Sequence, residues 1–271
     1  MSFVWSDRYV EEFRRDGYVI FRGIVPPALV RDLRREAHIG RDIARRERGT
    51  LAQRLHGIGR YEELSFRPFR DYLDLPALRD AVTRVLSPHH APGTEDILSI
   101  LIEPADKPWT TGWHRDVRDT ERAPEVIERF WQDCLNLDLF NQVNCALYED
   151  SCTWVVPGSH ARRDTPAEAE LATRSRIPAV PIPDPTGLSN EELERVNLEY
   201  CDQFPGAKRI LLDPGDYAVY RNIMWHVGNY VPYRIRATLH DMVPTQTYRD
   251  WLRWKAPFDA KWRAAAPATP N

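Results

Sequence analysis

The sequence predicts a single, mainly β domain with helical additions. Two observations carry the β assignment: an apolar run covers residues 96–102, and apolar side chains alternate with polar ones over residues 140–148. Turn-forming dipeptides such as Pro157-Gly158 separate the extended segments. The length of the chain predicts the single domain, because 271 residues can bury one large core and β barrels of this size fold as single domains.

We expect residues 1–271 to form this one domain, with a core over 96–243, a helical N-terminal cover over 1–95 and an aromatic-rich C-terminal segment over 244–271. The net charge of -3 indicates neither a nucleic-acid partner nor a membrane partner. The four cysteines form no Cys-x-x-Cys pair, which disfavours a structural zinc site and a disulfide scaffold. Without a cationic leader or a run of ~20 apolar residues, we expect a cytoplasmic protein that acts on a small molecule.

The N-terminal cover begins with a helix that Ser6 or Asp7 caps and that Asp16-Gly17 ends. A short strand over 18–21 follows, and Pro26-Pro27 opens a second helix with apolar residues at the helical period. One more helix is predicted from the apolar positions Leu73, Leu75, Leu78, Val82 and Val85. These elements together predict helices packed beside a sheet.

Residues 41–60 carry six arginines and few apolar residues, and three glycines interrupt the segment. Two interpretations fit this composition: a solvated helix face followed by a loop, or a mobile lid with an anion-binding edge. If the substrate is phosphorylated or is a carboxylate, this segment is the first candidate for contacts with it.

In the second half of the chain, the polar positions of the 140–148 strand are Gln142 and Asn144. Residues 210–212 and 217–220 flank an Asp-Pro-Gly-Asp turn and predict a hairpin. The remaining expected elements are a helical insertion over 120–137, a strand over 153–156, a helix around 190–196 within an insertion over 161–207, and a last strand from Arg234 to Val243.

Two histidines and one carboxylate form the candidate metal site. His114 and Asp116 lie two positions apart, and His226 lies far downstream. On an extended segment, side chains two positions apart point the same way, so His114 and Asp116 can reach one ion. Two imidazoles and a carboxylate that leave coordination positions open are the facial triad of non-haem Fe(II) sites. The competing interpretation is a surface histidine beside a solvated aspartate, because a His-x-Asp triplet arises easily by chance.

Five motifs in order give the chain a resemblance to the phytanoyl-CoA dioxygenase family. They are Phe13 to Ile20, Trp113-His114-Arg115-Asp116, Val155 to His160, Asp213-Pro214-Gly215-Asp216 and His226 to Arg236, and they span roughly residues 8 to 243. The resemblance implies a double-stranded β-helix (jelly-roll, cupin-like) core. It also implies an enzyme that uses Fe(II), 2-oxoglutarate and O2 to oxidise an unactivated C–H bond, with release of succinate and CO2.

The resemblance also assigns residues to the co-substrate. Members of the family place an arginine ten or eleven positions after the distal histidine, where it holds the far carboxylate of 2-oxoglutarate, and Arg236 is at that distance from His226. Arg234 is the alternative, because alternation along a strand does not separate the two. Asn144 matches a strand position that helps to hold the co-substrate in related enzymes, and Gln142 is its alternate.

The reaction branch follows from the carboxylate ligand. Related halogenases replace this aspartate with a small residue that leaves a site for chloride, so Asp116 favours hydroxylation over halogenation. Desaturation, epoxidation and ring formation would use the same groups. Aromatic residues that flank the motifs, Tyr220 among them, are candidate substrate contacts, and the first choices are Trp113, Trp154 and Trp225, although aromatic side chains are equally the normal filling of a barrel.

Two other functions fit the same residues. A cupin-like non-haem metalloenzyme could use the triad without 2-oxoglutarate, and variants of Arg236 and Arg234 would then leave 2-oxoglutarate consumption unchanged. A catalytically silent barrel could act as a binding or sensor module, and no succinate would then be released under any conditions. The substrate and the oligomeric state are not predicted by the sequence.

Overall fold

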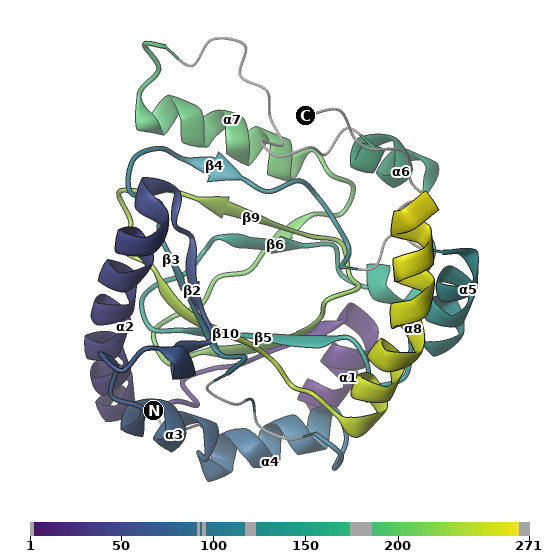
Figure 1. Cartoon of the computed structure of the whole chain (residues 1–271), viewed down its shortest axis with the longest axis horizontal. Coiled ribbons are helices and arrows are strands. Elements are labelled where there is room, and N and C mark those ends of the chain that lie inside the picture. The colour runs from purple at the N-terminus through teal and green to yellow at the C-terminus, as the bar shows by residue number, and fades with distance from the viewer. Residues whose placement is uncertain (1–2, 91–92, 94–95, 117–122, 174–185, 266–271) are drawn as a thin grey trace.

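The computed structural model describes residues 3–90, 93, 96–116, 123–173 and 186–265. Two antiparallel sheets face each other across the centre of the molecule, and helices surround them (Figure 1). The larger sheet has the strand order β1-β8-β5-β10-β3-β2, and the smaller one has the order β4-β9-β6-β7. This arrangement, with its helical cover, confirms the predicted fold class.

The six-stranded sheet combines strands from both ends of the chain. Its members are β1 (Tyr18–Phe21), β2 (Arg54–His56), β3 (Ser99–Ile102), β5 (Asn141–Ala146), β8 (Tyr217–Arg221) and β10 (Ala237–Met242). Because β1 and β2 belong to this sheet, the N-terminal residues contribute strands as well as a helical cover.

Alternation along these strands separates an apolar face from a polar one. The outward face carries the main hydrophobic core, to which Val19, Leu55, Ile100, Val143 and Leu239 contribute one residue from each of five strands. The helices α1 (Arg8–Asp16), α2 (Pro27–Arg48), α3 (Arg67–Leu73) and α4 (Pro76–Val85) pack on this face. The inward face therefore carries the polar residues of the same strands.

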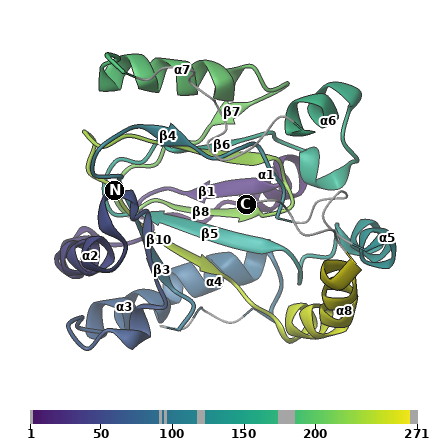
Figure 2. The same ribbon diagram turned by 45° about the horizontal axis from the view of Figure 1, so that its top comes forward.

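The four-stranded sheet consists of β4 (Trp109–Thr110), β6 (Thr153–Val155), β7 (Lys208–Arg209) and β9 (His226–Tyr230). Helix α7 (Asn190–Asp202) covers its outer face, as Figure 2 shows. Ser189 caps α7 with a capping box that includes Glu192, which explains why the helix begins there. An aromatic cluster fills the space between this helix and the sheet.

Three helices lie at one end of the sheets: α5 (Pro124–Asp133), α6 (Pro166–Thr173) and α8 (Gln246–Ala265) (Figure 1). Trp251 of α8 packs edge-on against Phe140, with ring centroids 4.9 Å apart, and Phe130 of α5 joins the same cluster. None of the helices in the described ranges has the length and apolar character that crossing a membrane requires.

Several predicted elements differ from the structure. The last strand begins at Ala237 and not at Arg234, and Asp7, the N-cap residue of α1, makes no side-chain capping hydrogen bond. The predicted hairpin is wrong: residues 210–212 continue from β7 alongside β6, whereas β8 lies in the other sheet between β1 and β5. The Asp213–Asp216 turn therefore connects the two sheets. The prediction failed because a turn motif indicates where a chain reverses but not which strands then pair. The helix expected over Leu73 to Val85 is two helices, since Leu75 precedes Pro76 and adopts an extended ψ of 112°.

Candidate metal centre

The two histidines are neighbours across a pair of antiparallel chain segments. His226 begins β9, and His114 forms an isolated bridge with it through two backbone hydrogen bonds of 3.1 and 3.0 Å. Directly opposed residues of antiparallel chains project to the same side. The two imidazole rings accordingly lie with their centroids 4.2 Å apart.

A bulge turns His114 into the space between the sheets. Thr110 pairs with Asn229, and continuation of this register would pair Trp113 with His226. The pair is instead His114 with His226, so one extra residue lies on the β4 side. Such an insertion redirects the side chains that follow it. It turns His114 inward and Trp113 outward.

Hydrogen bonds fix the tautomers of both histidines. His114 Nδ1 lies 2.7 Å from the Gly112 carbonyl oxygen, and His226 Nδ1 lies 2.8 Å from the Met224 carbonyl oxygen. A carbonyl only accepts hydrogen bonds, so each Nδ1 carries a proton, and in a neutral ring the lone pair that can bind a cation then lies on Nε2. Such backbone partners are typical of metal-binding histidines.

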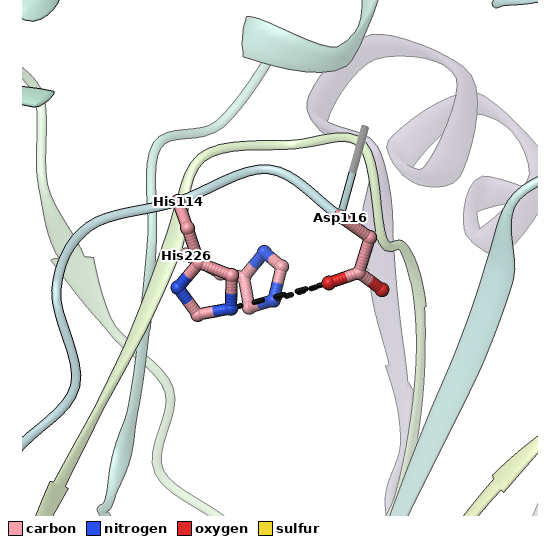
Figure 3. Close-up of side chains that lie close together, drawn as sticks. All are labelled: His114, Asp116 and His226. Atoms are coloured by element: carbon pink, nitrogen blue, oxygen red, sulfur yellow. Dashed lines mark ion pairs between the residues drawn. The ribbon is translucent and has the colours of Figure 1, made fainter. Parts of the chain in front are cut away.

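Asp116 completes the cluster (Figure 3). Its Oδ1 lies 3.9 Å from His114 Nε2 and 3.7 Å from His226 Nε2. One ligand atom from each of the three residues lies within 4.8 Å of the others, which is a spacing that can hold one metal ion. Two neutral imidazoles and a carboxylate fit the facial triad of Fe(II). The structure therefore brings together the three residues predicted as metal ligands.

The cluster opens onto a cavity of about 330 Å³ between the two sheets. The six-stranded sheet contributes Arg54, Leu101, Gln142, Asn144, Tyr220 and His240, with Arg236 just before β10. The facing segments contribute Thr111, Thr153, Val227, Gly228 and Tyr230 beside the triad. The lining is mostly polar, as the inward face of the larger sheet requires.

Arg236 is held at the wall of this cavity by buried partners. Its Nε lies 3.0 Å from Asp150 Oδ2, its backbone N–H donates to Glu103 at 2.8 Å, and its guanidinium lies 4.9 Å from the centre of the Tyr230 ring. Burial works to lower the pKa of Arg236, but the Asp150 carboxylate outweighs it and raises this pKa. Its Nη1 is buried, and no atom of the described residues forms a hydrogen bond with it. This orphaned donor fits a carboxylate ligand in the cavity.

Arg234 does not line the cavity. Its side chain is 55% exposed, and its Nη1 lies 3.5 Å from Glu194 Oε1 near the end of α7. Residues 232–236 are not part of β10, so the alternation that would align Arg234 with Arg236 does not extend to them. The two arginines therefore differ in burial and in partner.

Asn144 and Gln142 both line the cavity but make different contacts. Asn144 connects the two sheets, because its Nδ2 donates to Thr153 of the four-stranded sheet at 3.3 Å. Its Oδ1 lies 2.8 Å from Nδ1 of His240, which belongs to the same sheet as Asn144. Gln142 Nε2 donates to Asp116 Oδ2 at 2.8 Å. Gln142 is thus bound to the carboxylate of the candidate metal site.

The three tryptophans predicted as substrate contacts lie outside the cavity lining. Trp113, Trp154 and Trp225 belong to the cluster between the four-stranded sheet and α7, where Trp113 stacks on Phe204 with centroids 4.4 Å apart. Trp225 precedes the inward-facing His226, and Trp154 pairs with Val227, which packs in the same cluster. Alternation along a strand turns the neighbour of an inward ligand outward.

Of the other lining residues, Tyr220 is one of the aromatic candidates for substrate contact, and Arg54 belongs to the arginine-rich segment over 41–60, whereas sequence reasoning missed Tyr230 and His240. The last two follow the inward alternation of their strands, which is a signal that was present in the sequence. Burial, and after it the charge of Arg54, lowers the pKa of His240 to about 3, so this side chain is neutral near pH 7. Arg54 lies on a three-residue strand that was not predicted, and its side chain makes no ion pair or hydrogen bond with the described residues.

Comparisons with known proteins agree with this geometry. Residues 13–195 match the family model described as phytanoyl-CoA dioxygenase (PhyH), which confirms the resemblance drawn from the motifs. The matched region contains His114 and Asp116 and ends before His226. No curated protein sequence matched the chain.

Several solved structures share the fold. AviO1 from Streptomyces viridochromogenes Tue57 is 16% identical with a TM-score of 0.54, and the match covers 97% of each chain. EctD from S. alaskensis, solved with 2-oxoglutarate and 5-hydroxyectoine, is 19% identical with a TM-score of 0.53 over 88% of this chain and 76% of that one. The epimerase SnoN, solved with Fe3+, alpha ketoglutarate and nogalamycin RO, is 17% identical with a TM-score of 0.52 over 87% and 82%.

Proposed function

The chain belongs to the phytanoyl-CoA dioxygenase family, and we propose that it is an Fe(II)- and 2-oxoglutarate-dependent dioxygenase that hydroxylates an unactivated C–H bond of a small molecule. The observation that carries the proposal is the cluster of His114, Asp116 and His226, with both Nδ1 atoms committed to backbone carbonyls. EctD and SnoN were both solved with this co-substrate, and SnoN was also solved with iron, which supports the assignment.

In this proposal His114 Nε2, His226 Nε2 and Asp116 Oδ1 hold Fe(II). Arg236 takes the far carboxylate of 2-oxoglutarate through its orphaned Nη1, since its Nε is committed to Asp150. When bound, Fe(II) and 2-oxoglutarate supply the oxidation, in which O2 provides one oxygen atom to the product and one to succinate, and CO2 leaves. The residues of the chain hold the reactants in place and keep a defined volume for the substrate.

Asn144 remains the candidate for a further contact with the co-substrate, because its amide lines the same cavity between the sheets. The aromatic substrate wall expected from the tryptophans is replaced by Tyr220, Tyr230 and Leu101. Within this lining Tyr220, Gln142 and Asp116 are joined by hydrogen bonds. We propose a substrate of modest size that carries polar groups, because most of the lining can donate or accept hydrogen bonds.

The test is an anaerobic titration of the purified apoprotein with Fe(II) and then 2-oxoglutarate. A visible charge-transfer band that saturates with 2-oxoglutarate is the expected result, and His226→Ala should abolish it. Bound iron without this band would favour a metalloenzyme that does not use 2-oxoglutarate. The absence of iron binding would favour a silent binding barrel.

A screen for substrate-stimulated succinate release then identifies the reaction. Hydroxylation adds one oxygen atom to the product mass, desaturation removes two hydrogen atoms, and epimerisation leaves the mass unchanged. Because SnoN is an epimerase, the last outcome should be measured as well, with a chiral separation. A product without added oxygen would overturn the hydroxylase assignment and leave the co-substrate assignment intact.

A further inference from the structure

The two carboxylate oxygens of Asp116 have different neighbours. Oδ1 faces the two histidines, at 3.9 Å from His114 Nε2 and 3.7 Å from His226 Nε2. Oδ2 accepts a hydrogen bond of 2.8 Å from Gln142 Nε2. Only one of the two oxygens is therefore directed at the point that the histidines share.

The amide of Gln142 is fixed in this orientation from both sides. A carboxylate only accepts hydrogen bonds, so the NH2 group must face Asp116. On the other side, the Tyr220 hydroxyl donates to Gln142 Oε1 at 3.2 Å. Tyr220 is buried, and burial raises its pKa, so the hydroxyl stays protonated and remains a donor. Each donor thus meets an acceptor in both hydrogen bonds of the series from Tyr220 through Gln142 to Asp116.

This chain of hydrogen bonds connects Asp116 to the rigid part of the fold. Gln142 and Tyr220 are direct cross-strand partners on β5 and β8, which are inner strands of the six-stranded sheet. Asp116 lies outside the named strands, although its backbone N–H donates to the Asn222 carbonyl at 3.1 Å. A ligand on an irregular segment needs a partner on a regular element to hold its side-chain orientation.

We propose that Gln142 is a positioning residue that makes Asp116 a one-oxygen ligand, with Tyr220 holding its amide. This inference rests on the proposed function, because it assumes that His114, Asp116 and His226 bind a metal ion. By occupying Oδ2, Gln142 keeps the second oxygen away from the ion and preserves a coordination position for the 2-oxo acid. It replaces the sequence-based interpretation of Gln142 as a direct contact of the co-substrate.

The test compares Co(II) binding by the wild type, Gln142→Met and Tyr220→Phe, without 2-oxoglutarate. Gln142→Met keeps the length of the side chain and removes the donor, and loss of such a partner typically weakens metal binding by about 10- to 100-fold. We expect a loss in this range for Gln142→Met and a smaller loss for Tyr220→Phe, in which the amide stays but is no longer held. Gln246→Met is the matched control, because Gln246 Nε2 also donates to a carboxylate oxygen, Asp250 Oδ1 at 2.8 Å, but it does so on the exposed side of α8 and outside the cavity lining. It should bind Co(II) like the wild type.

The outcomes separate this inference from the proposed function. If the wild type binds no Co(II), the proposed function fails. If the wild type binds and Gln142→Met binds equally well, only the positioning role fails. A second titration, of the Co(II)-loaded proteins with 2-oxoglutarate, covers the remaining case. If Gln142→Met keeps its Co(II) affinity and loses only 2-oxoglutarate affinity, Gln142 contacts the co-substrate and the inference is overturned. If Gln142→Met does not fold, as judged by circular dichroism, the comparison of Tyr220→Phe with the wild type decides the question.

Discussion

Arg236 gives the most demanding prediction, because it pairs with Asp150 in the structure and, in our proposal, also binds 2-oxoglutarate. Its side chain is 4% exposed, and it pairs with Asp150, whose side chain is 3% exposed. Arg236→Gln leaves Asp150 buried without its counter-charge, which typically costs about 3–5 kcal/mol of stability. The same change removes a charged donor to 2-oxoglutarate, worth about 1.5–3 kcal/mol, or about 10- to 100-fold in affinity.

A double variant separates the two effects. Arg236→Gln combined with Asp150→Asn removes both charges, so urea denaturation should show that most of the lost stability returns. The anaerobic titration with Fe(II) and 2-oxoglutarate should show that the lost affinity does not return. Arg234→Gln is the control and should match the wild type in both assays, because Arg234 is exposed and distant from the cavity. A folded double variant with wild-type affinity for 2-oxoglutarate would refute the assignment of Arg236.

Three further predictions concern stability and charge. Burial lowers the pKa of His160 from 6.5 to about 4. Between these pH values the unfolded state binds more protons than the folded state, so the free energy of unfolding decreases as the pH is lowered, by up to about 1.4 kcal/mol per pH unit. His160→Asn should flatten this slope in urea unfolding. Gly17→Ala should destabilise by about 1–3 kcal/mol, because Gly17 has φ 81° and a Cβ there would lie 2.4 Å from His160 Nδ1; Gly158→Ala, with a similar φ of 76° and its nearest contact an ordinary 3.5 Å from the Arg15 carbonyl oxygen, should cost less. Arg54→Gln should weaken 2-oxoglutarate binding, because it removes a cation from the cavity lining, and unchanged affinity in the titration would contradict this. Its free energy of unfolding should stay within about 0.5 kcal/mol of the wild type, because Arg54 makes no ion pair with the described residues.

The residues that could be predicted from the sequence share one property: their chemistry and spacing are local. The spacing of His114 and Asp116 predicts two ligands on one side of an extended segment, and the structure directs both toward His226. Local alternation could have predicted the outward turn of Trp113 beside an inward His114. The extra residue that lets His114 pair with His226 could not be predicted. Pairing between distant segments is not visible in a single sequence.

The polar cavity lining shows where local reasoning could have gone further and where it had to stop. Thr238 and His240 follow Arg236 at steps of two, and both side chains make their hydrogen bonds on the inward side, to Asp150 and Asn144. Extending the alternation along one strand would have found His240. Arg54 is different, because its place beside the cavity depends on the pairing of Arg54 with Leu101, a residue of the cavity wall on a strand far along the chain. A strand of three residues carries too little periodicity to be recognised, so only the folded sheet assigns this charge to the cavity.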